Sequence, residues 1–112
     1  MVKIEAVVRP GVLEDIKDGL SKYGIHGMTV AQVMGCGLQK GRKEVYRGTE
    51  YSINLLPKVK IEIVAADKDA DGVVEVIIKA ARTGEIGDGK IFITKIENAI
   101  RIRTGEKGDA AV

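Results

Sequence analysis

Two glycine-rich stretches contain the residues of this chain that are best suited to binding an anion. The first, Gly35–Tyr51, has three glycines within its first seven residues, Gly35, Gly37 and Gly41. Glycine tolerates positive φ, so such a stretch can turn several backbone N–H groups onto one ligand. The same stretch also contains four cations, Lys40, Arg42, Lys43 and Arg47. It predicts an anion cradle, although a tight turn after a strand is an equally good interpretation of these residues alone.

The second stretch, Thr83–Lys90, is a more specific signal. Its sequence Gly87-Asp88-Gly89-Lys90 combines flexible backbone donors with a point charge suited to phosphate, and Asp88 can accept a bond from a hydroxyl group. Neither stretch matches the Walker loop or the dinucleotide-binding fingerprint. The two stretches together favour polyphosphate binding over two plain turns.

The other polar residues give weaker signals. Arg101 and Arg103 are two positions apart, so in a strand both side chains would lie on one face and meet one anion, but a solvated strand face explains them equally well. Lys58 at a strand start usually serves solubility, and a structural or solvent-facing role suits the sole histidine, His26. No Ser-His-carboxylate group or carboxylate pair suggests catalysis, so we expect a binding protein and not an enzyme.

The composition limits the classes of function. The chain has 112 residues, which predicts one domain, 1–112, and its net charge of +2 gives no global field for nucleic-acid or membrane binding. One Phe, three Tyr and no Trp offer few rings for stacking bases. The single cysteine, Cys36, excludes an internal disulfide and suits a reducing compartment. Because no apolar run approaches membrane-spanning length and no signal-peptide pattern is present, we expect a cytoplasmic protein.

Hydrophobic periodicity predicts the elements that position these residues. The predicted order is strand 2–8, helix 12–23, strand 25–34, strand 58–64, a helix ending at 81 and strand 91–96. We expect Asp67 or Asp69 to cap the second helix, whose inward face carries Val73, Val74, Ile77, Ile78 and Ala81. The segment between the second and third strands lacks apolar periodicity and is predicted to be a long loop. A short extended piece at 100–103 and a loose tail at 105–112 are expected to follow.

The order βαββαβ predicts a ferredoxin-like α+β sandwich. In that topology the first and second strands run one way and the third and fourth run the other way. Both glycine-rich stretches, Lys58 and Lys90 should therefore lie at the same end of the sheet. The edge strands stay apart within one subunit, so a ligand that bridges them would be held more easily between subunits. Exposed sheet edges also favour an oligomer.

Five separated motifs occur in an order that resembles the PII nitrogen-regulatory signal-transduction proteins: Gly27–Val30, Gly35–Tyr51, Leu56–Val64, Thr83–Phe92 and Ile100–Glu106. The resemblance implies a homotrimer of ferredoxin-like subunits that binds ATP or ADP in three clefts between subunits and senses 2-oxoglutarate together with MgATP. It also implies a flexible effector loop at 37–55, a second glycine loop at 82–90 and a C-terminal loop and tail at 98–112.

The same resemblance implies the residues of the binding sites. The nucleotide would contact Gly35, Gly37, Gln39, Gly87, Asp88, Gly89 and Lys90, and across the subunit boundary Thr29, Glu62, Arg101 and Arg103. The 2-oxoglutarate would be held by a second set of residues, Gln39, Lys40, Gly41, Lys58 and Gly87. Gln39 would complete the Mg²⁺ shell beside the phosphates, and Lys58 would pair with the distal carboxylate of 2-oxoglutarate.

The resemblance further implies how the loop is used. Arg47 matches a residue that inserts into an ammonium transporter, so any membrane association would run through that partner; nitrogen-assimilation enzymes or regulators are the other expected partners. Tyr51 matches a tyrosine that some members carry uridylylated or adenylylated. Leu38 stands where many relatives have Arg. A PII-like adenylate sensor that responds to a different effector is therefore an alternative. Another alternative is a slow ATPase or phosphotransferase, which phosphate release abolished by Lys90→Ala would favour.

Overall fold

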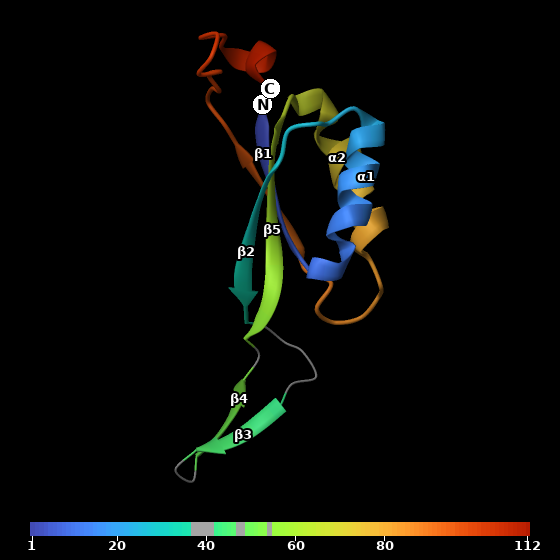
Figure 1. The fold of residues 1–112 in the computed structure, drawn as a ribbon, viewed down its shortest axis with the longest axis vertical. Helices are drawn as coiled ribbons and strands as arrows, with labels where there is room; N and C mark the ends of the chain where they lie inside the picture. The colour runs from blue at the N-terminus through green and yellow to red at the C-terminus, as the bar shows by residue number, and fades with distance from the viewer. Residues whose placement is uncertain (37–41, 47–48, 54) are drawn as a thin grey trace.

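The computed structural model describes residues 1–36, 42–46, 49–53 and 55–112, with only the backbone described in the two short middle ranges. Four strands and two α-helices form the main body (Figure 1): β1 Val2–Val8, α1 Leu13–Tyr23, β2 Thr29–Gly35, β5 Leu56–Ala65, α2 Ala70–Ala81 and β6 Lys90–Lys95. Short 3₁₀ turns lie at Pro10–Val12, Asp67–Asp69 and Gly108–Ala111. None of the described helices is long and apolar enough to cross a membrane.

The four strands form one antiparallel sheet in the order β2-β5-β1-β6. Because neighbouring strands are antiparallel, the ends of β1 and β2 and the starts of β5 and β6 all lie at one end of the sheet. This is the ferredoxin-like topology that the order of elements predicts. In this sheet β2 and β6 are the edges, and they are separated by the two central strands.

The core lies between one face of the sheet and the two helices (Figure 1). Alternate residues of β1 and β5 are buried there, as strand geometry requires, and they meet apolar residues from both helices: Ile4, Ile61, Ile63, Ile16, Leu20, Val73 and Ile77. The opposite face of the sheet carries two diagonal ion pairs between β1 and β5, Lys3–Glu62 at 3.8 Å and Lys60–Glu5 at 3.5 Å. The predicted inward face of α2 is confirmed for Val73, Ile77 and Ala81, which are buried.

The helix ends follow the predicted signals only in part. Gly24 ends α1 with a φ of 104°, and its N–H bonds the Leu20 carbonyl oxygen. The predicted capping of α2 is wrong, because Asp69 stands at the N-cap position without a side-chain capping bond. Asp67 instead accepts a bond of 2.6 Å from the amino group of Met1 and lies 3.5 Å from Lys95 Nζ.

The segment between β2 and β5 contains two strands that the sequence did not predict. Antiparallel strands β3 Arg42–Tyr46 and β4 Thr49–Ile53 pair with each other and not with the main sheet. Figure 1 shows this hairpin beyond the end of the sheet at which β2 finishes and β5 begins. A two-stranded ladder is held by backbone groups, which every residue except proline supplies. The pattern of apolar residues therefore did not predict this hairpin.

The C-terminal segment also differs from the prediction. The chain turns at Ile102–Thr104 instead of extending, and Arg101 N–H bonds the Glu106 carbonyl oxygen at 2.9 Å. Gly108 N–H bonds the Ala99 carbonyl oxygen at 3.0 Å and the Asn98 side chain at 3.0 Å. The expected extended piece and the loose tail are both wrong, because backbone bonds between residues 98–108 close the segment on itself.

Candidate anion-binding site

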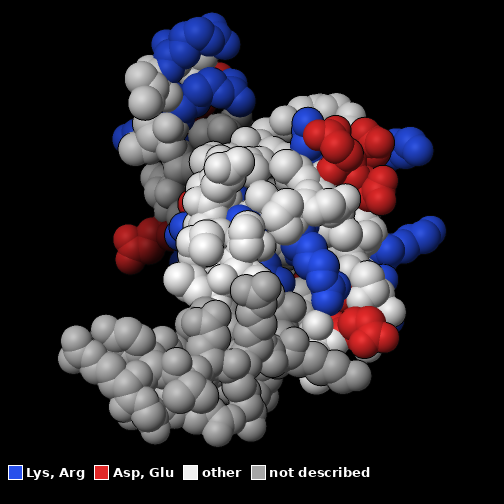
Figure 2. All heavy atoms as spheres, turned by 60° about the horizontal axis from the view of Figure 1, so that its bottom comes forward, with Lys and Arg blue, Asp and Glu red and all other residues white. Residues whose placement is uncertain are grey.

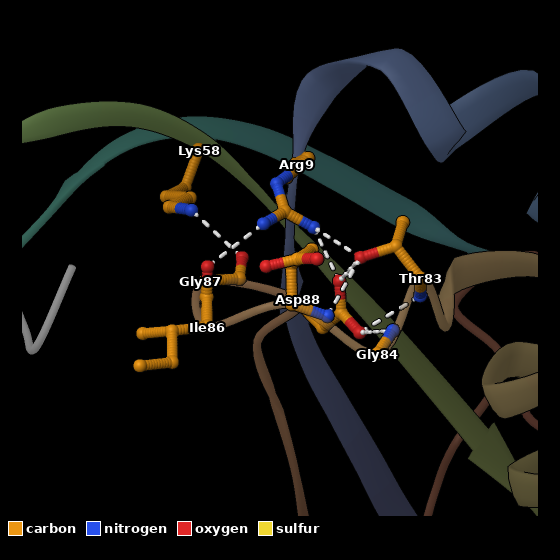
Figure 3. Close-up of polar contacts among 8 residues, drawn as sticks. Arg9, Lys58, Thr83, Gly84, Ile86, Gly87 and Asp88 are labelled. Carbon is orange, nitrogen blue, oxygen red and sulfur yellow. Dashed lines mark hydrogen bonds and ion pairs between the residues drawn. The ribbon is translucent and has the colours of Figure 1, made fainter. Parts of the chain in front are cut away.

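The predicted meeting of the second glycine loop with the strand ends is present in the structure. The loop between α2 and β6 lies beside Arg9, which follows β1, and beside Lys58, which is near the start of β5 (Figure 3). Lys58 Nζ donates a bond of 3.0 Å to the Gly87 carbonyl oxygen. Arg9, directly after one central strand, and Lys58, in the other central strand, therefore both contact this loop.

Asp88 holds the loop together from inside. One carboxylate oxygen accepts bonds from the N–H groups of Thr83 at 2.8 Å and Gly84 at 2.9 Å. The other accepts bonds from the Thr83 hydroxyl and from the Arg9 guanidinium. An ionised carboxylate offers about four acceptor positions, so these donors occupy the group. Within the loop, the Asp88 side chain thus accepts a bond from the hydroxyl of Thr83. The role of Asp88 in nucleotide binding stays a prediction.

These bonds favour the charged form of the carboxylate. The Thr83 hydroxyl, the N–H groups of Thr83 and Gly84, and the Arg9 guanidinium together hold the pKa of Asp88 well below its ordinary value of 3.8. Because the pKa is lowered in the folded state, the stabilisation is present above the unfolded-state pKa and is lost as the pH falls through the folded-state pKa.

Asp88→Asn is therefore expected to be less stable than the natural protein at neutral pH, by an amount that stays constant down to about pH 5 and narrows at lower pH. Denaturant unfolding of both proteins across the acid range measures this difference. Asp109→Asn is a suitable control, because Asp109 is exposed and lies beside Thr29 and Glu62, at a cavity that no residue of this loop lines. A stability difference that does not change between pH 6 and pH 2 would contradict the assigned role of the Asp88 carboxylate.

Arg9 is a site residue that sequence reasoning missed. Its guanidinium bonds Asp88, the Thr83 hydroxyl oxygen at 3.3 Å and the Ile86 carbonyl oxygen at 2.9 Å (Figure 3). The available signal was its position directly after the first strand, because the βαββαβ topology puts the end of that strand at the same end as both glycine-rich stretches. The proline and glycine that follow Arg9 indicate a turn, and this signal gives no reason to assign Arg9 to the site.

Two glycines lie close to neighbouring groups beside these cations. Gly89 has a φ of 108°, and a Cβ built on it would lie 1.9 Å from the Val7 carbonyl oxygen, so the loop passes against the backbone of β1. At the end of β2, a Cβ on Gly35 would lie 2.9 Å from Cγ of Lys58. Gly35 therefore leaves room for the Lys58 stem. Lys90, the first residue of β6, follows Gly89 and is exposed.

The residues predicted to complete the site across a subunit boundary lie at the other end of the sheet. Thr29, at the start of β2, pairs with Glu62 on β5, and both line an open cavity of about 880 Å³ together with Arg101. Arg101 bonds Glu106 at 2.9 Å and the Ala110 carbonyl oxygen at 3.1 Å. Arg103 is exposed on the turn, so the expected side-by-side arrangement of the two arginines on a strand is wrong.

Several predicted residues lie outside the described part of the chain. These are Gly37, Gln39, Lys40, Gly41 and Arg47, together with Leu38. Tyr51 belongs to β4, of which only the backbone is described. Their roles in ligand binding, partner docking and modification stay predictions.

The charges around this end of the molecule are local. Figure 2 brings the lower end of Figure 1 forward and shows Lys and Arg in separate patches beside Asp and Glu, with uncharged surface between them. Among the described residues on this face, the Lys and Arg side chains lie in separate groups and not in one continuous band.

Fold and site together define a small ferredoxin-like domain with glycine backbone and cations at one end of its sheet, an arrangement that suits an anion. Comparison with known families is more specific. The family model described as nitrogen regulatory protein P-II matches residues 1–106, so the chain belongs to the P-II family.

Individual relatives agree with this assignment. Nitrogen regulatory protein P-II 2 of Methanothermobacter thermautotrophicus is 56% identical over 112 residues, which cover 100% of this chain and 97% of that protein. Nitrogen regulatory protein P-II of Haemophilus influenzae is 53% identical, and nitrogen regulatory protein P-II 1 of Escherichia coli K12 is 54% identical, each with 100% of both chains covered. These relatives are named as regulatory proteins and not as enzymes, which supports nitrogen-regulatory signalling as the general role.

Proposed function

We propose that this protein is a nitrogen-regulatory signal transducer that binds ATP or ADP in clefts between the subunits of a homotrimer and, with MgATP, also binds 2-oxoglutarate. Binding switches the effector loop at 37–55, which controls an ammonium transporter and enzymes or regulators of nitrogen assimilation. Such a ligand acts by its different affinity for the two states of the loop. Membership of the P-II family supports the regulatory part of this proposal.

The observation that carries the nucleotide proposal is the separation of two residue sets within one chain. Lys58 and the loop ending at Lys90 are at one end of the sheet, whereas Thr29 and Arg101 line a cavity at the other end. The six residue steps from Thr29 to Gly35 along β2 correspond to about 20 Å. A nucleotide that uses both sets therefore needs a second copy. Copies that meet head to tail in a closed ring would bring opposite ends together at each boundary.

The chemistry of the phosphate end supports the same ligand. Lys90 supplies a point charge beside glycine backbone, a combination that suits phosphate oxygens. Mg²⁺ prefers oxygen ligands, so the Gln39 side-chain oxygen and the nucleotide phosphates form a suitable donor set, and the bound cation would neutralise phosphate charge. Lys58 has the charge needed to hold the distal carboxylate of 2-oxoglutarate.

The proposal predicts that 2-oxoglutarate releases heat on titration into the protein only when MgATP is present. The two ligands share one cleft, so the nucleotide and its cation complete the site for the second ligand. Calorimetry with and without MgATP measures this, and sedimentation in the same buffer tests for the trimer. If 2-oxoglutarate gives no heat in either titration while MgATP still binds, 2-oxoglutarate is not the effector and a different effector must be sought. No binding of MgATP would overturn the nucleotide proposal itself.

A further inference from the structure

Arg9 contacts three different kinds of group in the second glycine loop. Its planar guanidinium bonds the Asp88 carboxylate, the Thr83 hydroxyl oxygen and the Ile86 carbonyl oxygen (Figure 3). The carboxylate bond neutralises charge, but the carbonyl bond has a separate geometric consequence. A carbonyl group that is held by a cation fixes the orientation of the whole peptide plane to which it belongs.

Two consecutive peptide planes of this loop are fixed in that way. Arg9 bonds the Ile86 carbonyl oxygen at 2.9 Å, and Lys58 bonds the Gly87 carbonyl oxygen at 3.0 Å. The described chain has no cis peptide bonds, and in a trans peptide the N–H points opposite to the C=O. The N–H of Gly87 must then point away from Arg9, and the N–H of Asp88 away from Lys58.

These two N–H groups are also available. The Thr83 and Gly84 N–H groups bond the Asp88 carboxylate, and the Glu85 N–H bonds the Thr83 hydroxyl oxygen at 3.1 Å. No acceptor in the described ranges of the chain bonds the N–H of Gly87 or Asp88. The first half of the loop thus satisfies the donors of Thr83, Gly84 and Glu85, and the adjacent N–H groups of Gly87 and Asp88 are among the donors that the second half leaves for a ligand.

We infer that Arg9 is a positioning residue for phosphate binding: by holding the Ile86 carbonyl oxygen it turns the Gly87 N–H toward the ligand, without touching the ligand itself. This inference rests on the proposed nucleotide site and assigns the residue that shapes its phosphate end. Donors that are oriented before the ligand arrives need no ordering on binding, which raises affinity.

The identity of the side chain follows from the same geometry. Arginine presents its donors in a rigid fork, so one group bonds the Asp88 carboxylate and the Ile86 carbonyl oxygen together. Lysine has the same charge on a flexible stem and lacks that fork. Arg9→Lys therefore separates geometry from charge, whereas Arg9→Met removes both but keeps a stem of similar length.

The test measures MgATP affinity by calorimetry and, in the ligand-free proteins, the residual dipolar coupling of the Gly87 N–H, which reports the direction of that bond. We expect both Arg9 variants to bind MgATP about tenfold or more weakly, which matches the loss of a charge-assisted hydrogen bond. The Gly87 coupling should change in both, while couplings within β1 and β5 stay the same. Lys79→Met, which removes an exposed charge from α2, should change neither quantity.

Two outcomes would overturn the inference. Unchanged affinity and an unchanged Gly87 coupling in Arg9→Lys would show that only charge matters. Weaker binding with an unchanged Gly87 coupling would show that Arg9 acts on the ligand directly. If the natural protein does not bind MgATP, the proposed nucleotide site fails by itself. The Gly87 coupling of the ligand-free variants then still decides whether Arg9 sets the direction of this peptide.

Discussion

Replacing Gly89 with alanine is expected to lower the free energy of unfolding by about 3 to 5 kcal/mol, because backbone strain and overpacking add at this position. The φ of 108° is one that residues with a Cβ rarely adopt, and the added carbon would lie 1.9 Å from the Val7 carbonyl oxygen. That oxygen belongs to a central strand, and the adjacent Val8 is buried in the core. Either β1 must move or the loop must leave the sheet.

Urea denaturation measures this loss, with both proteins at one concentration because assembly of copies would raise the apparent stability with concentration. Gly105→Ala is the matched control. Gly105 also has a positive φ, 73°, but a Cβ there would meet no atom within 4 Å. Gly105→Ala should lower the free energy of unfolding by only about 1 to 2 kcal/mol, because it adds the strain of the backbone conformation without a close contact. Equal losses in the two variants would show that the approach of Gly89 to β1 contributes nothing.

Lys58→Ala is expected to weaken 2-oxoglutarate binding by at least about 100-fold, since it removes the cation that would pair with the distal carboxylate. Affinity for MgATP should change by less than about threefold. The bond from Lys58 to the Gly87 carbonyl oxygen is lost, but the Asp88 N–H should keep its direction, because the carboxylate of the same residue stays bonded to Thr83, Gly84 and Arg9. Gly87 has no side chain that could hold its own N–H in this way. The two ligands should therefore respond differently to this one substitution.

Calorimetric titrations of the variant with MgATP alone, and with 2-oxoglutarate in the presence of MgATP, separate the two effects. Lys60→Ala is the matched control, because Lys60 lies on the same strand and the same face, where it pairs with Glu5 at 3.5 Å. It should leave both affinities close to those of the natural protein. A parallel fall in both affinities for Lys58→Ala would mean that Lys58 shapes the nucleotide site and that its assignment to 2-oxoglutarate is wrong.

The sequence predicted the elements that build the core because the pattern of apolar and polar residues within each element indicates which of its sides is buried. Alternation in Lys58–Val64 specified which side of β5 faces the helices, and the structure buries Val59, Ile61 and Ile63 there. The order of elements then predicted the shared end of the loops. The hairpin of β3 and β4 was missed for the opposite reason, since its two strands pair outside the main sheet.

The amino-acid sequence by itself determined the ferredoxin-like order, the two faces of the central strands and the glycine-rich stretches at one end. Only the tertiary structure decided what the polar groups of that end do. Arg9 and Asp88 are 79 positions apart, and their bond helps to hold the loop that carries the predicted phosphate-binding residues. Periodicity reports how a segment meets the core, whereas a hydrogen bond between distant residues depends on where the folded backbone brings their side chains together.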